Sequence, residues 1–154
     1  MNIPYSELPN NSKVLIFQSD KEINEKELFL IQEDLDNFSR NWLTHGKPVR
    51  NTFKIFNYFI CFFIDESSYQ TSGCSIDSVV NLIKSIGTRF NIDFFNRNNI
   101  VYLDNRQAKL LTIDNFKSLI QPDIIIYNNL VQTKSDFENK WKIPVKESWL
   151  NRYV

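Results

Sequence analysis

The sequence predicts an α+β domain built on an antiparallel sheet in ferredoxin-like (βαββαβ) order, with a C-terminal extension covering the open face of that sheet. Strand-sized apolar runs and two amphipathic helical segments follow one another in the order strand, helix, strand, strand, helix, strand. One run, residues 58–65, is apolar on both faces and so belongs at the centre of a sheet covered on both sides. The last third of the chain is less regular but rich in aromatic residues, which need burial.

The first strand and helix are predicted from residues 13–46. Residues 13–19 (KVLIFQS) carry apolar side chains on both faces, as a buried strand does. Ser19 or Asp20 then caps a helix in which apolar residues recur at steps of three and four as far as Trp42. We expect Gly46 to cap the end of this helix, because glycine adopts the left-handed conformation common there.

The remaining strands of the predicted sheet follow along the chain. Residues 49–56 and 58–65 form two strands joined by a turn, and a helix beginning near Cys74 continues to about Phe90. Residues 98–103 form the fourth strand. In the strand at 58–65, one face carries Phe59, Cys61 and Phe63, and the other carries Ile60, Phe62 and Ile64.

We treat residues 1–154 as a single domain with its core at about 13–103 and an extension at 104–154. The extension is expected to hold short elements at 108–111, 112–120, 124–127, 133–141 and 147–153. Because its aromatic side chains need cover, we place it on the sheet face that the two helices leave open. A homodimer interface on that face is the alternative.

Composition limits the classes of function. Lys plus Arg and Asp plus Glu each number 18, so the net charge is zero and no nucleic-acid or anionic membrane partner is expected. No apolar run is long enough for a membrane-spanning helix, and no signal peptide is visible. The two cysteines, Cys61 and Cys74, form no disulfide framework, which favours a cytoplasmic protein. One histidine and two cysteines make no recognised zinc spacing, so neither a metal nor a cofactor is expected.

The predicted topology brings three polar segments to one end of the sheet. These are the loop at 45–48, the loop at 65–74 and the residues at 104–106 that follow the fourth strand. The only histidine, His45, and a cysteine at a helix start, Cys74, are thereby placed near each other. We regard this junction as the candidate functional site.

A thiol-dependent reaction is one hypothesis for the junction. The N-terminal end of a helix favours thiolate, so Cys74 is a candidate nucleophile. His45 is the candidate base and Asp65 the residue that orients it. Asp77 competes for the same positive helix end, and a packed or capping role is the simpler interpretation of Cys74.

A ligand-binding or regulatory domain is the function we favour, with a site formed by the His45 loop and the segment Ser72–Asp77. Its ligand is an unidentified small molecule or protein. A structural or self-associating protein is the third hypothesis. The candidate ligand-binding residues are Trp42, Gly46, Ser72, Gly73, Ser75 and Asp77.

Five segments carry a resemblance to a known family: PYSELP at 4–9, WLTHG at 42–46, DES with SGCSID within 65–77, NNLV at 128–131, and IPV with ESW within 143–149. On these motifs the chain resembles a family of small uncharacterised Bacteroidetes proteins commonly labelled "ABC transporter ATPase". The resemblance implies no established activity. An ABC ATPase needs a glycine-rich loop with a lysine and a magnesium-binding hydroxyl, and the sequence contains no such motif, so we treat the label as a misannotation.

Overall fold

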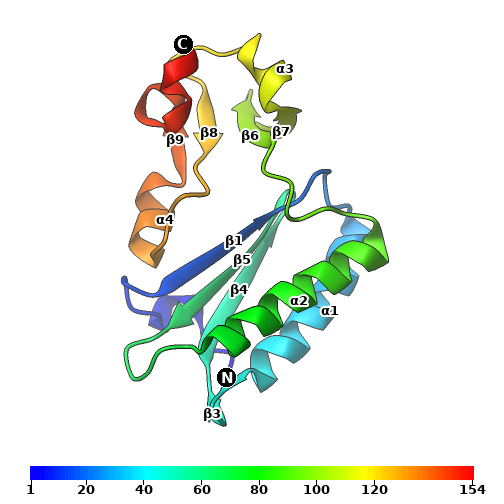
Figure 1. Cartoon of the computed structure of the whole chain (residues 1–154), viewed down its shortest axis with the longest axis vertical. Helices are drawn as coiled ribbons and strands as arrows, with labels where there is room; N and C mark the ends of the chain where they lie inside the picture. The colour runs from blue at the N-terminus through cyan, green and yellow to red at the C-terminus, as the bar shows by residue number, and fades with distance from the viewer.

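The computed structural model describes residues 1–154, and its central strand is the one apolar on both faces. This strand, β5 (Phe59–Asp65), lies between β1 (Lys13–Gln18) and β4 (Arg50–Phe56) and pairs antiparallel with both. Residues 59–64 are each 1% exposed or less. The molecule is thus α+β with antiparallel sheets, as predicted (Figure 1).

Two long helices cover one face of this sheet. Helix α1 (Glu25–Asn41) and helix α2 (Gly73–Phe90) lie along the same face in Figure 1. Their apolar stripes pack on alternate β5 residues, and a single buried cluster joins Ile31, Leu35, Val79 and Ile83 to Ile60, Phe62 and Ile64. The apolar stripes of the helices, which repeat every 3.6 residues, therefore pack against alternate residues of the strand in one core.

The first helix begins later than the sequence predicted. Asn24 is its N-cap, in a reciprocal capping box with Glu27. The predicted caps, Ser19 and Asp20, do not cap the helix. The hydroxyl of Ser19 instead donates to the carbonyl of Lys21, 2.6 Å away. The intervening segment is held to the sheet by the Ile23 N–H, which donates to the carbonyl of Asn57.

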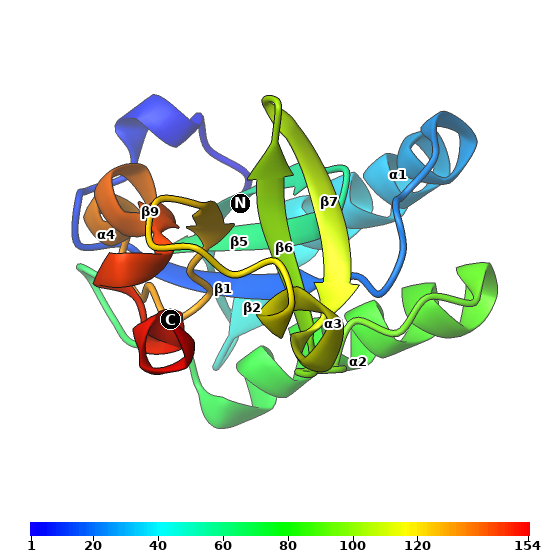
Figure 2. The same ribbon diagram turned by 90° about the horizontal axis from the view of Figure 1, so that it is seen from above.

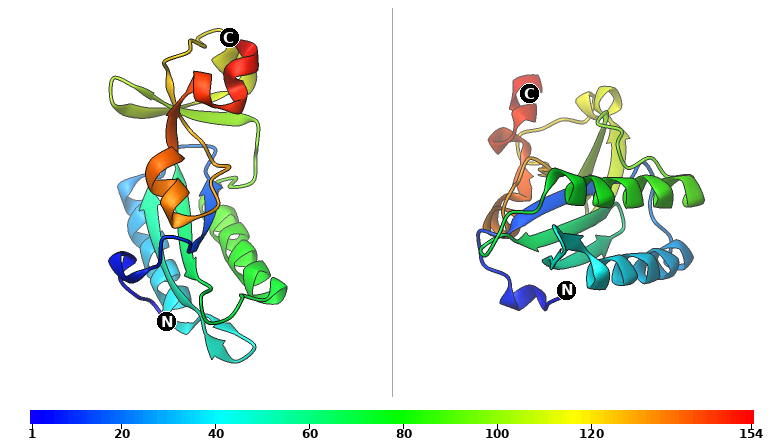
Figure 3. Two further views of the ribbon diagram at one scale, coloured as in Figure 1. Left: turned by 90° about the vertical axis from the view of Figure 1, so that its left-hand side faces the viewer. Right: turned by 60° about the horizontal axis from the view of Figure 1, so that its bottom comes forward.

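The other face of the sheet is covered from two distant parts of the chain. Phe63 lies 4.9 Å, ring centre to ring centre, from Phe137 of helix α4 (Lys134–Lys140), and Phe59 lies 4.9 Å from Trp141. Two residues of the N-terminal segment, Ile3 and Leu8, belong to the same cluster. Figure 3 shows α4 and this segment opposite α1 and α2. Part of the extension, including α4, thus packs on this face together with the N-terminal segment, while other parts of the extension belong to a second sheet.

A buried lysine ties these two covers together. Lys134 is 6% exposed, and its Nζ donates to the carbonyls of Tyr5 and Leu8 at 3.0 and 2.8 Å. The ammonium also lies 4.4 Å from the centre of the Tyr5 ring. Because hydrogen bonds and the ring face replace lost water, the buried charge is tolerated and fixes the N-terminal segment to α4.

A second sheet lies beyond the first, in the strand order β7-β6-β8-β9. Its members are β6 (Asn99–Asp104), β7 (Gln107–Thr112), β8 (Ile125–Tyr127) and β9 (Lys142–Pro144). Helix α3 (Ile113–Lys117) and the short 3-10 helices Val145–Glu147 and Trp149–Tyr153 accompany it, and a third buried cluster includes Phe116, Ile126, Val145 and Leu150. Figure 2 shows β6 and β7 running across β1 and β5.

The ferredoxin-like order is not confirmed, because the predicted fourth strand belongs to this second sheet. In that order the fourth strand would pair with β1, but β6 pairs with β7 and β8. Asn105 and Arg106, both with positive φ (51° and 67°), make a two-residue hairpin turn between β6 and β7. β7 takes one edge of β6 through this short turn and β8 takes the other, so β6 has no edge left for β1, which remains an edge strand.

None of the four helices combines the length and apolar character that crossing a lipid bilayer requires.

Gly87 provides a test of the packing at the end of α2. Its carbonyl accepts the N–H groups of Asn91, which has positive φ (55°), and Ile92, and a Cβ at this position would collide with the backbone oxygen of Ile92. Gly87→Ala is therefore expected to lower the free energy of unfolding by about 1–3 kcal/mol in urea denaturation. The neighbouring exposed substitution Thr88→Ala is the control, and equal stability of the two variants would contradict the packing described.

Candidate functional site

The loop that holds His45 is a tight hairpin. Strands β2 (Leu43–Thr44) and β3 (Lys47–Pro48) pair antiparallel, and the two residues between them, His45 and Gly46, have φ of 48° and 74°. Two successive left-handed residues define the turn type favoured in two-residue hairpins. Gly46 therefore serves this turn and does not cap α1, which ends at Asn41.

The start of α2 is capped by Ser72. Its hydroxyl oxygen accepts the N–H of Ser75 at 3.1 Å, so Gly73 and Cys74 occupy the first helical turn. Asp77 lies one turn further on, and the first turn contains no acidic residue. The predicted competition between Asp77 and Cys74 for the helix end is therefore weaker than the sequence suggested.

The structure brings two of the three predicted segments together, the His45 loop and the start of α2, whereas residues 104–106 form the turn between β6 and β7 in the second sheet. The indole N–H of Trp42 donates to the carbonyl of Ser75 at 3.1 Å, and the Ser75 hydroxyl donates to the carbonyl of Leu43 at 2.8 Å. The Ser72 N–H donates to the hydroxyl of Thr44 at 2.9 Å. These three bonds engage the polar groups of Trp42, Ser72 and Ser75 in joining α2 to the hairpin.

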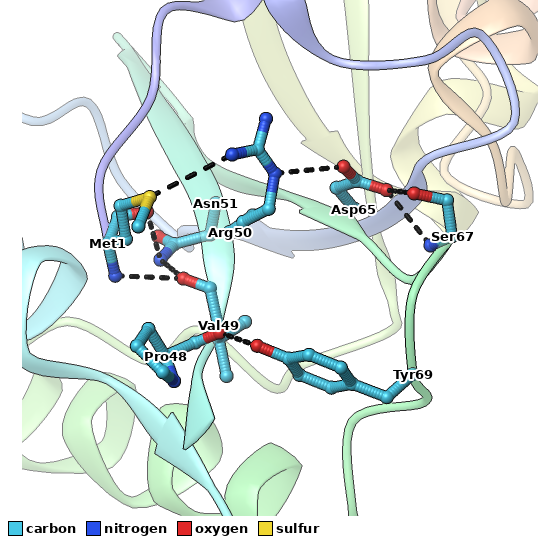
Figure 4. Close-up of polar contacts among 8 residues, drawn as sticks. All are labelled: Met1, Pro48, Val49, Arg50, Asn51, Asp65, Ser67 and Tyr69. Atoms are coloured by element: carbon cyan, nitrogen blue, oxygen red, sulfur yellow. Dashed lines mark hydrogen bonds and ion pairs between the residues drawn. The ribbon is translucent and has the colours of Figure 1, made fainter.

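Asp65 is held by its own neighbours (Figure 4). One carboxylate oxygen lies 3.1 Å from Nε of Arg50, and the other accepts the N–H of Ser67 at 2.9 Å. Burial alone would raise the pKa of Asp65, but hydrogen bonds from Ser67 and the charge and hydrogen bond of Arg50 outweigh it and hold the pKa below its ordinary value. Close by, the Tyr69 hydroxyl donates to the carbonyl of Pro48.

The three predicted catalytic residues share no direct interaction. His45 and Cys74 are exposed, and no hydrogen bond or ion pair joins either of them to the other or to Asp65. None of these three residues lines any of the three main grooves of the molecule. No cluster of His, Cys, Asp or Glu side chains is suited to holding a metal ion.

Another groove lies beside the free edge of β1. It has a volume of about 630 Å³. We call it the edge groove. β1, α2, the α2–β6 loop, the segment after β8 and the last 3-10 helix contribute its lining, which includes Ile16, Gln18, Val80, Phe95, Arg97, Leu130 and Trp149.

Three exposed apolar side chains line the edge groove. Leu130, Phe95 and Trp149 are 69%, 42% and 39% exposed, and they are three of the eight large hydrophobic residues left exposed on the whole chain. They come from separate segments and converge on one concavity. Such a convergence marks a surface for binding more strongly than single exposed residues do.

The edge groove also holds one unpaired charge. Arg97 is exposed and is the only charged residue among the fifteen that line the groove. Its guanidinium has no ion-pair or hydrogen-bond partner among the pairs that the chain forms. Sequence reasoning missed this groove, because nothing in the sequence of the loop at 91–98 or of residues 128–131 shows that they meet β1.

No family model, no curated protein and no solved structure matches this chain. The family resemblance read from the sequence motifs therefore stays a prediction, and function has to be argued from the geometry of the molecule.

Asp65 gives a pH-dependent prediction for the loop that follows β5. Its pKa is lower in the folded chain than in the unfolded chain, where it is about 4. Its stabilising effect is therefore complete above about pH 4 and is lost as the pH falls through the folded pKa. We expect Asp65→Asn to reduce the free energy of unfolding by about 1–3 kcal/mol at neutral pH, and the difference from the natural protein to shrink in acid.

Urea denaturation as a function of pH measures this difference. Asp77→Asn is the matched control, because Asp77 is exposed and forms no ion pair. A deficit in Asp65→Asn that stays constant from neutral to acid pH would contradict the role assigned to the Arg50 and Ser67 bonds.

The two cysteines are expected to differ sharply in alkylation. Cys74 is exposed, whereas Cys61 is fully buried and burial raises the pKa of its thiol. We expect iodoacetamide to label one thiol in the native protein and two in urea, as counted by mass spectrometry. Because no hydrogen bond joins His45 to Cys74, His45→Ala should leave the labelling rate of Cys74 unchanged at every pH. A rate that falls in His45→Ala would instead support the thiol-enzyme hypothesis.

Proposed function

We propose that this chain is a small ligand-binding or regulatory protein, and that its ligand occupies the edge groove. The observation that supports this most is the convergence of three exposed apolar side chains and an unpaired Arg97 on one concavity of about 630 Å³. Known ligand sites combine apolar walls with a few polar groups in this way. The ligand class that fits is an apolar molecule bearing a negative charge.

The position of the groove fits the same proposal. In the chain order of a ferredoxin-like sheet, β1, β5 and β4 take three of the four places, and the fourth place lies beside β1. We propose that the edge groove is this vacant place, kept open because β6 pairs within the second sheet. A cytoplasmic location and the family resemblance remain parts of this proposal that rest on the sequence alone.

A thiol-dependent enzyme is the second candidate. One observation favours it: Cys74 is exposed in the first turn of α2, as a nucleophile there must be. The proposed base, His45, makes no hydrogen bond to it, so the binding function is better supported by the geometry. A homodimer formed through the exposed apolar residues is a further proposal that size-exclusion chromatography with light scattering tests.

The anionic dye anilinonaphthalene sulfonate tests the binding function, because it combines an apolar ring system with one negative charge. We expect saturable fluorescence enhancement from one site on the native protein. Leu130→Ser should weaken dye binding by removing part of the apolar rim, and Arg97→Gln should weaken it by removing the charge partner. Each loss should amount to about tenfold or less in Kd, as expected for one exposed contact.

Leu43→Ser is the control for the apolar rim, since Leu43 is 52% exposed but does not line the edge groove. All three substitutions lie at exposed positions, so the free energy of unfolding should change by less than about 0.5 kcal/mol. Dye binding that is absent, or equally strong in all variants, would refute the edge groove as a ligand site.

A further inference from the structure

We propose that the ligand of the edge groove is an extended peptide with an acidic group, which adds as a strand to the free edge of β1 and pairs its carboxylate with Arg97. This inference rests on the proposed binding function of the groove and specifies the class of ligand. It follows from the backbone of β1, from the two walls of the groove and from its charge.

The backbone of β1 presents an unused hydrogen-bonding edge. The Val14 N–H points away from β5 and donates to the carbonyl of Gln132 at 3.0 Å. Because the direction of backbone groups alternates along a strand, Ile16 and Gln18 present their N–H and C=O groups on the same edge. No strand pairs with β1 there, and no side chain bonds to these groups. Both residues line the edge groove.

The chain itself begins the pairing that a peptide would continue. Residues 132–134 run antiparallel to the start of β1, with a bridge between Lys13 and Thr133. The segment then diverges from β1, and Asn129 and Leu130 line the far wall of the groove instead. A peptide bonded to Ile16 and Gln18 extends this short ladder by about four residues at the usual strand spacing.

The walls of the groove suit the alternating side chains of a strand. Val80 and Phe94 pack with the helix-side core, whereas Tyr127 packs with the core on the opposite face of the first sheet. Successive side chains of an added strand point alternately toward these two sides. Main-chain bonds to an edge strand combined with pockets for alternate side chains define peptide recognition by strand addition.

The recessed position of this edge favours a single peptide over a second folded copy. Ile16 and Gln18 line the same groove as the exposed side chains of Phe95, Leu130 and Trp149, so this part of the β1 edge lies inside a concavity. An edge strand that belongs to a folded sheet brings neighbouring layers with it, and these would meet the rim first. The only charge in the lining, the unpaired Arg97, selects a partner with a carboxylate.

The experiment is a selection of displayed random peptides of about eight residues with free C-termini against the full chain. Enriched sequences are then synthesised unmodified and in two N-methylated forms, one for each alternate set of amides, because only one set faces β1. N-methylation keeps every side chain and removes the backbone donors of that set. We expect saturable binding of the unmodified peptide, about tenfold or greater loss in one of the two methylated forms, and new hydrogen-exchange protection of the Ile16 and Gln18 amides.

Two protein variants make the test specific to β1. Ile16→Pro removes an N–H that has no partner in the free protein, and proline is tolerated where an edge strand faces outward. Ile16→Val keeps that N–H and controls for the change of side chain. We expect the proline variant alone to lose peptide binding, and Arg97→Gln to lose the preference for acidic peptides. If Ile16→Pro fails to fold, the N-methylated peptides test the same bonds on the natural chain.

The outcomes separate this inference from the proposed function. The selection is repeated against a Leu130→Asp variant as its control. If the dye binds but no peptide is enriched on the natural chain relative to this variant, strand addition is overturned and the groove is left as a small-molecule site. Equal binding of the unmodified peptide and of both methylated forms also overturns it. A dimer that Ile16→Pro dissociates would identify a second copy as the occupant and overturn the peptide. Loss of both dye and peptide binding would refute the proposed function itself.

Discussion

Strand β5 carries large apolar side chains on both of its faces, and each face has to be shielded from water by another layer of the protein. Leaving a phenylalanine such as Phe62 or Phe63 in water costs about 1.5–3 kcal/mol relative to burying it. One layer of helices satisfies only the face of Ile60, Phe62 and Ile64. The opposite face needs a second cover, and the chain supplies it from the N-terminal segment and from α4. The layered arrangement of the molecule follows from this single strand.

Local patterns in the sequence were sufficient to predict most elements. The assignment of Phe59 and Phe63 to one face and Phe62 to the other is confirmed, because strand alternation depends on neighbouring residues alone. The short element predicted at 112–120 is present as helix α3, which Thr112 caps. The partners of β6 were not predictable. The turn to β7 at Asn105 and Arg106 lacks the usual turn glycine, and the other edge of β6 pairs with β8, which lies further along the chain.

The candidate site was predicted less well than the fold. Topology correctly placed the His45 hairpin beside the start of α2, where Trp42 and Ser75 bond across the junction. The catalytic roles of His45, Cys74 and Asp65 stay predictions, since nearness of loops does not fix side-chain direction. The edge groove depends on Phe95, Leu130 and Trp149, which lie far apart in the sequence. Each of them, taken alone, has the pattern of an ordinary core residue.

The hydrogen bonds of Lys134 to the N-terminal segment can form only late in the synthesis of the chain. Lys134 bonds to the carbonyls of Tyr5 and Leu8, which lie 129 and 126 positions earlier in the chain. A ribosome therefore releases the N-terminal segment and β5 long before α4 exists to complete their cover. Throughout that interval the face of Phe59, Cys61 and Phe63 lacks its second cover, and an exposed apolar strand is a template for aggregation. Slow elongation would lengthen this exposure, and a chaperone that shields apolar strands would shorten it.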